Sequence, residues 1–116
     1  MPNIEWNTNP NIYNVIYIIE FYGFSQDIFS NGNQLVARYV GQTTQLLRKR
    51  VEQHIKKKHT AINEYLRYHT IRTIKVSAIP TPTSDLNRVE QEFIHKYEKS
   101  DILLLNRQRY KKSIDI

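Results

Sequence analysis

Three polar side chains interrupt two apolar helical stripes in this sequence. In the stretch YVGQTTQLLRKRVEQHI (residues 39–55), helical spacing predicts a core-facing row that contains Arg50 and His54. In the stretch LNRVEQEFIHKY (residues 86–97), the same spacing places Glu90 in a row of aliphatic and aromatic residues. A guanidinium can clamp a phosphate, an imidazole can transfer a proton and a carboxylate can bind a cation. Beside strand tyrosines, these groups are the minimum needed to cleave a phosphodiester.

Each of the three residues also has a purely structural interpretation. A carboxylate at the edge of a core is costly unless a cation or hydrogen bonds compensate it, so Glu90 could form an internal ion pair with Arg50. Arg50 and His54 could instead lie on the flank of a stripe that is shifted by one position, where both would reach water. The sequence leaves both alternatives open, although three such residues on two helices are a rarer coincidence than one.

The composition indicates one compact domain without cysteine chemistry. A chain of 116 residues can bury roughly two thirds of its unfolded surface, which suffices for one core but not for two. The absence of cysteine excludes disulfides, thiolate nucleophiles and zinc–thiolate sites. The first residues show no secretory signal, and no apolar run approaches the roughly 20 residues of a membrane span. We therefore expect an intracellular protein, in the cytoplasm or with host DNA, that has no membrane partner.

The basic residues are concentrated in one part of the chain. Residues 1–37 contain three acidic residues and no lysine or arginine, so all 17 basic residues lie in residues 38–116. This asymmetry predicts a basic face, whose commonest partner is a polyanion. The alternative is a solvated surface that only keeps the protein soluble.

Apolar runs and turn residues predict three strands. The continuous β-branched and aromatic run at 14–24 should be the central strand of a sheet. The Asn-Gly pair at 31–32 should turn the chain into an antiparallel partner at 35–41. Alternating apolar residues predict a third, half-buried strand at 71–80.

Helical spacing and capping residues predict three helices. The expected helices are 44–58, capped by Thr43 or Thr44, 61–69, capped by Thr60, and 85–99, capped by Ser84 or Asp85. The predicted fold is therefore an α+β domain, with a small three-stranded antiparallel sheet flanked by about three helices. This domain, at 13–106, should lie between an N-terminal arm at 1–12 and a basic C-terminal tail at 107–116.

These motifs resemble the GIY-YIG nuclease domain over residues 13–106. VIY at 15–17 is similar to the first half of the family signature, and YVGQTT at 39–44 is similar to the second half. In many members with such a run, the family arginine lies nine residues after the glycine and the family histidine four residues later. Those positions hold Arg50 and His54 in this sequence.

Later residues extend the resemblance. Glu90 lies where the family has its metal-binding glutamate, and Asn106 follows an apolar pair, as the last core asparagine of the family does. His59 lies where some homing members have a further histidine.

The sequence departs from the family pattern in its first motif. Val15 replaces the glycine, and 22 positions separate Tyr17 from Tyr39, so the hairpin between them carries an insertion. NIY at 11–13 is an alternative first motif, with Tyr13 as its tyrosine. We favour Tyr17, because it lies within the strand-like run.

The resemblance implies a metal-dependent DNA endonuclease. The implied catalytic residues are Tyr17, Tyr39, Arg50, His54 and Glu90, with Gly41, His59 and Asn106 in support. Glu90 would bind one Mg²⁺ or Mn²⁺ ion, and Arg50 would hold the phosphate oxygens. A Tyr17 tyrosinate or the Tyr17–His54 pair would be the general base for water. Tyr39 would touch the scissile phosphate, and Asn106 would hold the site together from behind.

Nine basic residues are the predicted contacts to the nucleic-acid backbone. They are Arg48, Lys49, Lys56, Lys57 and Lys58 near the first helix, and Arg107, Arg109, Lys111 and Lys112 in the tail. The expected type is a small restriction-type or phage-type nuclease, which could be a homodimer. The inserted hairpin at about 23–36 could form the dimer contact or read a groove of the nucleic acid. The alternatives are a non-catalytic nucleic-acid-binding module of the same fold and a nuclease subunit that needs a partner chain.

Overall fold

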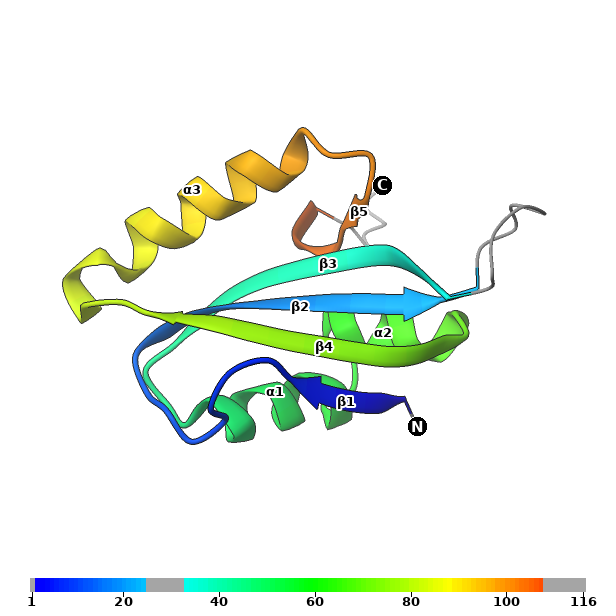
Figure 1. Cartoon of the computed structure of the whole chain (residues 1–116), viewed down its shortest axis with the longest axis horizontal. Coiled ribbons are helices and arrows are strands. Elements are labelled where there is room, and N and C mark those ends of the chain that lie inside the picture. The colour runs from blue at the N-terminus through cyan, green and yellow to red at the C-terminus, as the bar shows by residue number, and fades with distance from the viewer. Residues whose placement is uncertain (1, 25–32, 108–116) are drawn as a thin grey trace.

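A five-stranded mixed sheet forms the centre of the molecule (Figure 1). The computed structural model describes residues 2–24 and 33–107. The strands are β1 (Asn3–Trp6), β2 (Val15–Gly23), β3 (Gln34–Thr43), β4 (Ile71–Pro80) and β5 (Leu103–Leu104). The helices are α1 (Leu47–Lys56), α2 (Ala61–Tyr68) and α3 (Leu86–Glu98), with two short 3-10 helices, η1 (Thr83–Asp85) and η2 (Leu105–Arg107). None of the helices in these ranges has the length and apolar character that a membrane span requires.

The prediction of a three-stranded antiparallel sheet is wrong by two edge strands. The strand order is β1-β4-β2-β3-β5, and β2 is antiparallel to both β3 and β4, as expected. β1 pairs in parallel with β4, and β5 pairs in parallel with β3. The two added strands have only four and two residues, which is too short for a strand periodicity to be recognised in the sequence.

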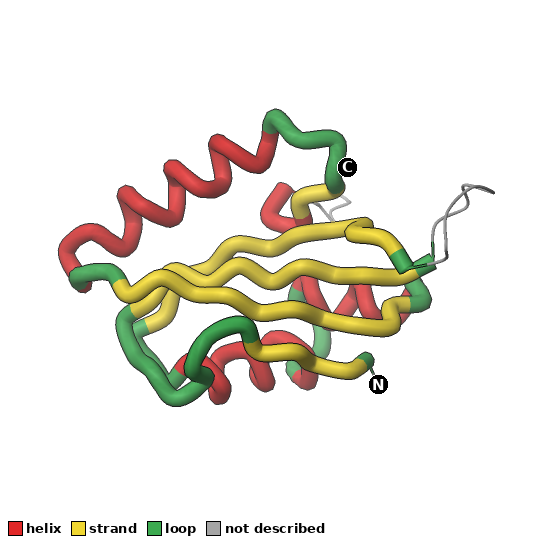
Figure 2. The backbone as a smooth tube through the Cα atoms, in the orientation of Figure 1, coloured by secondary structure: helices red, strands yellow, loops and turns green. Residues whose placement is uncertain are grey.

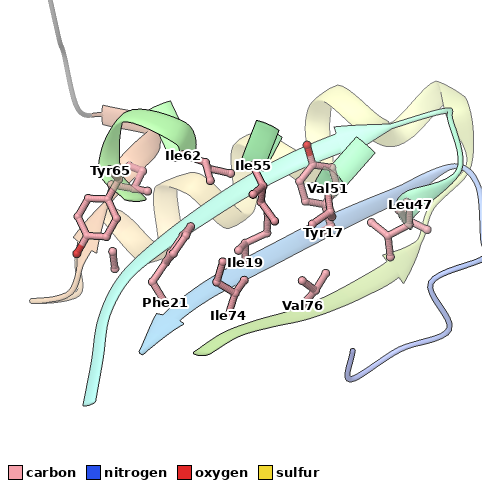
Figure 3. Close-up of a cluster of buried hydrophobic side chains, with 13 residues drawn as sticks. Tyr17, Ile19, Phe21, Leu47, Val51, Ile55, Ile62, Tyr65, Ile74 and Val76 are labelled. Carbon is pink, nitrogen blue, oxygen red and sulfur yellow. The ribbon is translucent and has the colours of Figure 1, made fainter. Parts of the chain in front are cut away.

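β2 is the central strand because it is apolar on both of its faces. Its residues Val15, Tyr17, Ile19 and Phe21 belong to a buried cluster with α1 and α2 (Figure 3). The alternate residues, Ile16 and Ile18, belong to a second cluster with α3. Figure 2 shows α3 running along the sheet apart from α1 and α2. A strand with both faces covered needs a continuous apolar run rather than an alternating one.

Backbone carbonyl groups from the N-terminal segment cap α1. The predicted cap by Thr43 or Thr44 is wrong, since no side chain caps this helix. The carbonyl groups of Pro10 and Ile12 instead accept hydrogen bonds of 2.9 Å from the first two N–H groups of α1. The helix therefore begins where the N-terminal segment supplies acceptors, later in the sequence than its capping residues predict.

The other two helices lie close to their predicted positions. Thr60 caps α2 as predicted, with its Oγ1 accepting a hydrogen bond of 3.1 Å from the Asn63 N–H group. Asp85 precedes α3 but makes no side-chain cap, because η1 leads directly into this helix. The predicted turn at 31–32 and the tail beyond residue 107 lie outside the described residues.

Candidate active site

A buried hydrogen bond joins β2 to α1. The Tyr17 side chain is 1% exposed, and its hydroxyl group lies 2.7 Å from His54 Nε2. His54 is 6% exposed and follows the buried Val51 on α1. Figure 3 shows the Tyr17 ring rising from β2 beside Val51. The polar contact is therefore enclosed by the same cluster that packs the helix on the sheet.

Gly41 is required where the Tyr17 ring crosses β3. The two residues are direct partners in the β2–β3 register. A Cβ atom on Gly41 would overlap the ring and the hydroxyl group of Tyr17. Glycine is thus the residue that allows the ring to lie against the neighbouring backbone.

Tyr39 completes an aromatic cluster with Tyr17 and His54. Tyr39 lies on the same face of β3 as Gly41, because alternate residues of a strand share a face. Its ring centroid lies 5.0 Å from that of His54, edge-on, and 6.5 Å from that of Tyr17. Tyr39 is half-buried, so this ring lies nearer the solvent than that of Tyr17.

Arg50 lies half-buried one helical turn before His54. Its Nη1 donates a hydrogen bond of 3.3 Å to Gln53 Oε1, and Gln53 Nε2 donates one of 3.4 Å to Gln45 Oε1. These amides orient the guanidinium. Because a guanidinium has five N–H donors, the bond to Gln53 leaves donors for a phosphate.

Burial keeps Tyr17 and His54 neutral. It raises the pKa of Tyr17 above its usual value of 10.0, and Tyr39 raises it further, while the charge and a hydrogen bond of Arg50 lower it. Burial lowers the pKa of His54 to about 4, and the positive charge of Arg50 acts in the same direction. At neutral pH His54 is therefore uncharged, and in the tautomer that carries its hydrogen on Nδ1 the Nε2 atom accepts the hydroxyl hydrogen of Tyr17. Without a bound ligand, the raised pKa therefore disfavours the Tyr17 tyrosinate, which was one of the two general bases that the family resemblance implies.

The negative charge of Glu90, on α3, affects the pKa values of Tyr17 and Tyr39. It lies half-buried on α3, and its Oε1 accepts a hydrogen bond of 2.9 Å from Gln42 Nε2. Burial is the main reason why the pKa values of Tyr17 and Tyr39 are raised, and the negative charge of Glu90 raises both further. The carboxylate is therefore within electrostatic reach of both phenols.

The two structural interpretations of the polar residues are not supported. His54 is buried, so it does not lie on a solvated flank of α1. Within residues 2–24 and 33–107, no ion pair joins Arg50 to Glu90. Arg50 instead contacts Gln53, and Glu90 contacts Gln42.

A cation at Glu90 would have this carboxylate as its charged protein ligand. In the described part of the chain, no group of three or more histidine, cysteine or carboxylate side chains could hold a metal ion. A lone carboxylate fits Mg²⁺, which keeps several of its water ligands in proteins. It does not fit a structural zinc site, which needs four protein ligands.

Asn106 clamps β3 beside the aromatic cluster. Its Oδ1 accepts a hydrogen bond of 2.9 Å from the Val40 N–H group, and its Nδ2 donates one of 2.7 Å to the Val40 carbonyl group. Val40 lies between Tyr39 and Gly41. One side chain thus satisfies both backbone groups of this residue, as a neighbouring strand would.

Two sequence candidates lie outside the cluster. His59, in the turn between α1 and α2, has a left-handed backbone with φ of 69° and a side chain that is 84% exposed. It lies 3.6 Å from Glu64 rather than near Tyr17. Tyr13 is 59% exposed, so Tyr17 is the tyrosine that the structure places beside His54.

The predicted nucleic-acid contacts differ in their surroundings. A hollow of about 510 Å³ along α1 is lined by Lys49, Arg50, Glu52, Gln53, Lys56 and Lys57. Lys58 lies at a separate hollow near α2. Arg48 contacts Asn11 and the ring of Trp6, and Arg107 is paired with Glu98. Arg109, Lys111 and Lys112 lie outside the described residues.

The sequence analysis missed the two glutamines that hold the charged groups. Gln53 follows Arg50 by three residues, a helical spacing that predicts contact. Gln42 follows Gly41, so strand alternation places it on the opposite face, towards α3. The sequence did not indicate which residue of α3 it would meet.

The comparison with known families agrees with the resemblance in the motifs. The model of the GIY-YIG catalytic domain matches residues 13–106. The chain belongs to the GIY-YIG family. Members of this family are nucleases, so the domain is a nuclease domain of the α+β class. No match was found among curated proteins or among solved structures.

Proposed function

We propose that this GIY-YIG domain is a metal-dependent DNA endonuclease. The observation that carries the proposal is the buried 2.7 Å contact between Tyr17 and His54. Arg50 and Glu90, on two different helices, act electrostatically on the same phenol. The Tyr17–His54 pair can transfer a proton, the Arg50 guanidinium can bind a phosphate and the Glu90 carboxylate can bind a metal ion. Together these groups suit a phosphodiester substrate.

Arg50 would bind the non-bridging oxygens of the scissile phosphate. Its guanidinium is half-buried and held by Gln53, so little side-chain freedom is lost when a phosphate arrives. Paired N–H groups match phosphate oxygens, and the positive charge stabilises the negative charge that develops in the transition state.

Tyr17 and His54 would move the proton of the attacking water. The water gives a proton to Tyr17 Oη as the hydroxyl proton of Tyr17 passes to His54 Nε2. The net acceptor is then the neutral imidazole, since burial disfavours a standing tyrosinate. A bound phosphate would raise the pKa of His54 towards its ordinary value, because a negative charge favours the imidazolium.

Glu90 would hold the cation. When bound, Mg²⁺ or Mn²⁺ supplies positive charge that stabilises the leaving oxygen and the phosphate. The Gln42 amide keeps the carboxylate in place, and Tyr39 would face the phosphate from the solvent side of the aromatic cluster.

Lysines along α1 would grip the phosphates that flank the scissile one. Lys49, Lys56 and Lys57 line the same hollow as Arg50, so one backbone strand could contact all four cations. Contacts of this kind strengthen binding without reading the base sequence.

Cleavage of a supercoiled plasmid tests the proposal. Glu90→Ala should slow Mg²⁺-dependent cutting by about 10²-fold or more, because the cation would lose the carboxylate that is proposed to hold it. The matched control is Glu92→Ala, whose carboxylate is 62% exposed on the same helix and pairs with Arg88. Nicked and linear products should be counted with Mg²⁺ and with EDTA, and circular dichroism should show that both variants fold.

Two results would reject the proposal. Full activity of Glu90→Ala would remove the carboxylate from the reaction. Plasmid binding by the wild-type protein without any cutting, under all divalent cations tested, would favour a non-catalytic binding module.

A further inference from the structure

Gln42 links the strand that carries Gly41 to the helix that carries Glu90. Its Nε2 donates a hydrogen bond of 2.5 Å to Asn87 Oδ1 and one of 2.9 Å to Glu90 Oε1. The two acceptors lie three residues apart on α3, which places them on one face of the helix. One amide nitrogen therefore uses both of its hydrogens across the seam between β3 and α3.

The direction of the Gln42 amide follows from the chemistry of its partner. An ionised carboxylate can only accept hydrogen bonds. The NH₂ group of Gln42 must therefore face Glu90, because the opposite orientation would bring two acceptor oxygens together. The neutral Gln42 amide holds the carboxylate and leaves its negative charge in place. A lysine or arginine at this position would neutralise that charge.

The remaining packing of α3 on the sheet does not determine the direction of the Glu90 side chain. The buried apolar residues that pack together there are Ile16, Ile18, Val40, Leu86, Ile94 and Leu104. Apolar packing is non-directional, so it sets the distance of the helix from the sheet. A glutamate side chain with several free torsions loses considerable entropy when it is held in one orientation.

We infer that Gln42 is a positioning residue, which holds the Glu90 carboxylate in the orientation that binds a divalent cation. The inference rests on the proposed function, since it presupposes a cation at Glu90. Gln42 engages Oε1, and the cation would bind through the carboxylate lone pairs that this bond leaves free. Partners of metal ligands typically change metal affinity by about 10- to 100-fold when they are removed.

Titration of the whole protein with Mn²⁺, followed by the electron paramagnetic resonance signal of the free ion, tests the inference. Gln42→Met keeps the length of the side chain and removes its donor. It should weaken Mn²⁺ binding by about 10- to 100-fold and leave the melting temperature close to that of the wild type. The matched control is Gln91→Met, the same change at an exposed neighbour of Glu90, which should bind Mn²⁺ as the wild type does.

Two further variants separate the possible failures. Glu90→Gln should abolish Mn²⁺ binding if the proposed function is right. Loss of binding in Glu90→Gln with wild-type affinity in Gln42→Met would overturn the inference and leave the proposed function standing. Wild-type affinity in both variants would overturn the proposed cation site itself.

Asn87→Ala distinguishes orientation of the carboxylate from docking of the helix. It removes the other acceptor of Gln42 and leaves the bond to Glu90, so Mn²⁺ affinity should change by less than about threefold. An equal loss of affinity in Asn87→Ala and Gln42→Met would mean that Gln42 only docks α3, against the inference. If Gln42→Met does not fold, Gln42→Asn, which is one methylene shorter and cannot span the same gap, replaces it in the titration.

Discussion

Tyr17 and His54 form one neutral unit although each can ionise in water. Burial raises the pKa of Tyr17 from 10.0 and lowers that of His54 from 6.5, so the two values move apart. The shared hydrogen stays on the phenol until another charge enters the site. The family resemblance implies this contact but not its protonation state, because desolvation depends on packing.

The buried neutral His54 should make the protein sensitive to acid. The pKa of His54 is about 4 in the folded protein and near 6.5 in the unfolded chain. Between these pH values the unfolded state binds more protons, so the free energy of unfolding falls as the pH falls through this window. The expected loss is about 3 kcal/mol between pH 6.5 and pH 4. Well above pH 6.5, where His54 is neutral in both states, it should add no pH dependence.

Urea unfolding at several pH values between 4 and 7 measures this effect. His54→Gln cannot titrate but can still accept a hydrogen bond from Tyr17, so its stability should depend less steeply on pH. His95→Gln is the matched control, because His95 is 73% exposed on α3. An unchanged pH slope in His54→Gln would contradict the burial of a neutral imidazole.

The N-terminal segment acts as a scaffold for α1. β1 extends the sheet beside β4, and the carbonyl groups of Pro10 and Ile12 cap the helix that carries Arg50 and His54. The family match begins only at residue 13, so this support lies outside the matched region. The arm predicted at 1–12 is therefore joined to the sheet in its described residues.

A chain shortened to begin at residue 13 should lose order in α1 first. The first two N–H groups of the helix would lose their acceptors, and loss of a cap typically costs about 1 kcal/mol. The β1–β4 pairing would also be lost. Hydrogen exchange measured by NMR should show faster exchange across α1 but unchanged protection in α3, which serves as the internal control. Equal protection of α1 in the two chains would show that the segment is dispensable.

At the scale of elements, the sequence predicts the features that depend on local spacing. β2, β4, α2 and α3 lie near their predicted positions because apolar periodicity and the Thr60 cap are local signals. β1, β5 and the start of α1 depend on hydrogen bonds to segments far away in the chain. Such long-range pairing leaves no periodic pattern of its own in a short segment.

At the scale of the molecule, the lysine and arginine side chains differ in whether they form an ion pair with a carboxylate. On α3, Arg88 pairs with Glu92, and Arg107 after this helix pairs with Glu98. In the described ranges, no carboxylate pairs with Lys49, Lys56 or Lys57, which line the hollow beside Arg50. Lysines without an ion pair in these ranges therefore lie together along the hollow beside Arg50, which Glu52 also lines.

Salt should weaken DNA binding mainly through the lysines of α1. If about five cations contact phosphates, a plot of log affinity against log salt should have a slope of roughly −4 to −5. Lys56→Gln and Lys57→Gln should each make the slope shallower by about 1, as measured by fluorescence anisotropy with labelled DNA. Arg88→Gln should leave the slope unchanged, since Arg88 is already paired. A slope near zero for the wild type would refute the basic face.

The candidate site could be predicted in its members but not in its supporting contacts. Tyr17, Arg50 and His54 were found because motif spacing and helical periodicity are visible in a sequence. The bond from Gln42 to Glu90 and the pairing of Arg107 depend on how α3 lies against β3. Helix–sheet placement is set by packing of the whole molecule, which a single sequence does not reveal.

The contact between Asn106 and Val40 can form only after most of the domain has been synthesised. This side chain reaches back 66 residues to fasten Val40, and it leaves the ribosome after both tyrosines, the arginine and the histidine. A nascent chain therefore contains Tyr17 and His54 before it contains Asn106, which holds β3 in place. The two hydrogen bonds to Val40 should therefore be among the last native contacts that the domain forms during its synthesis.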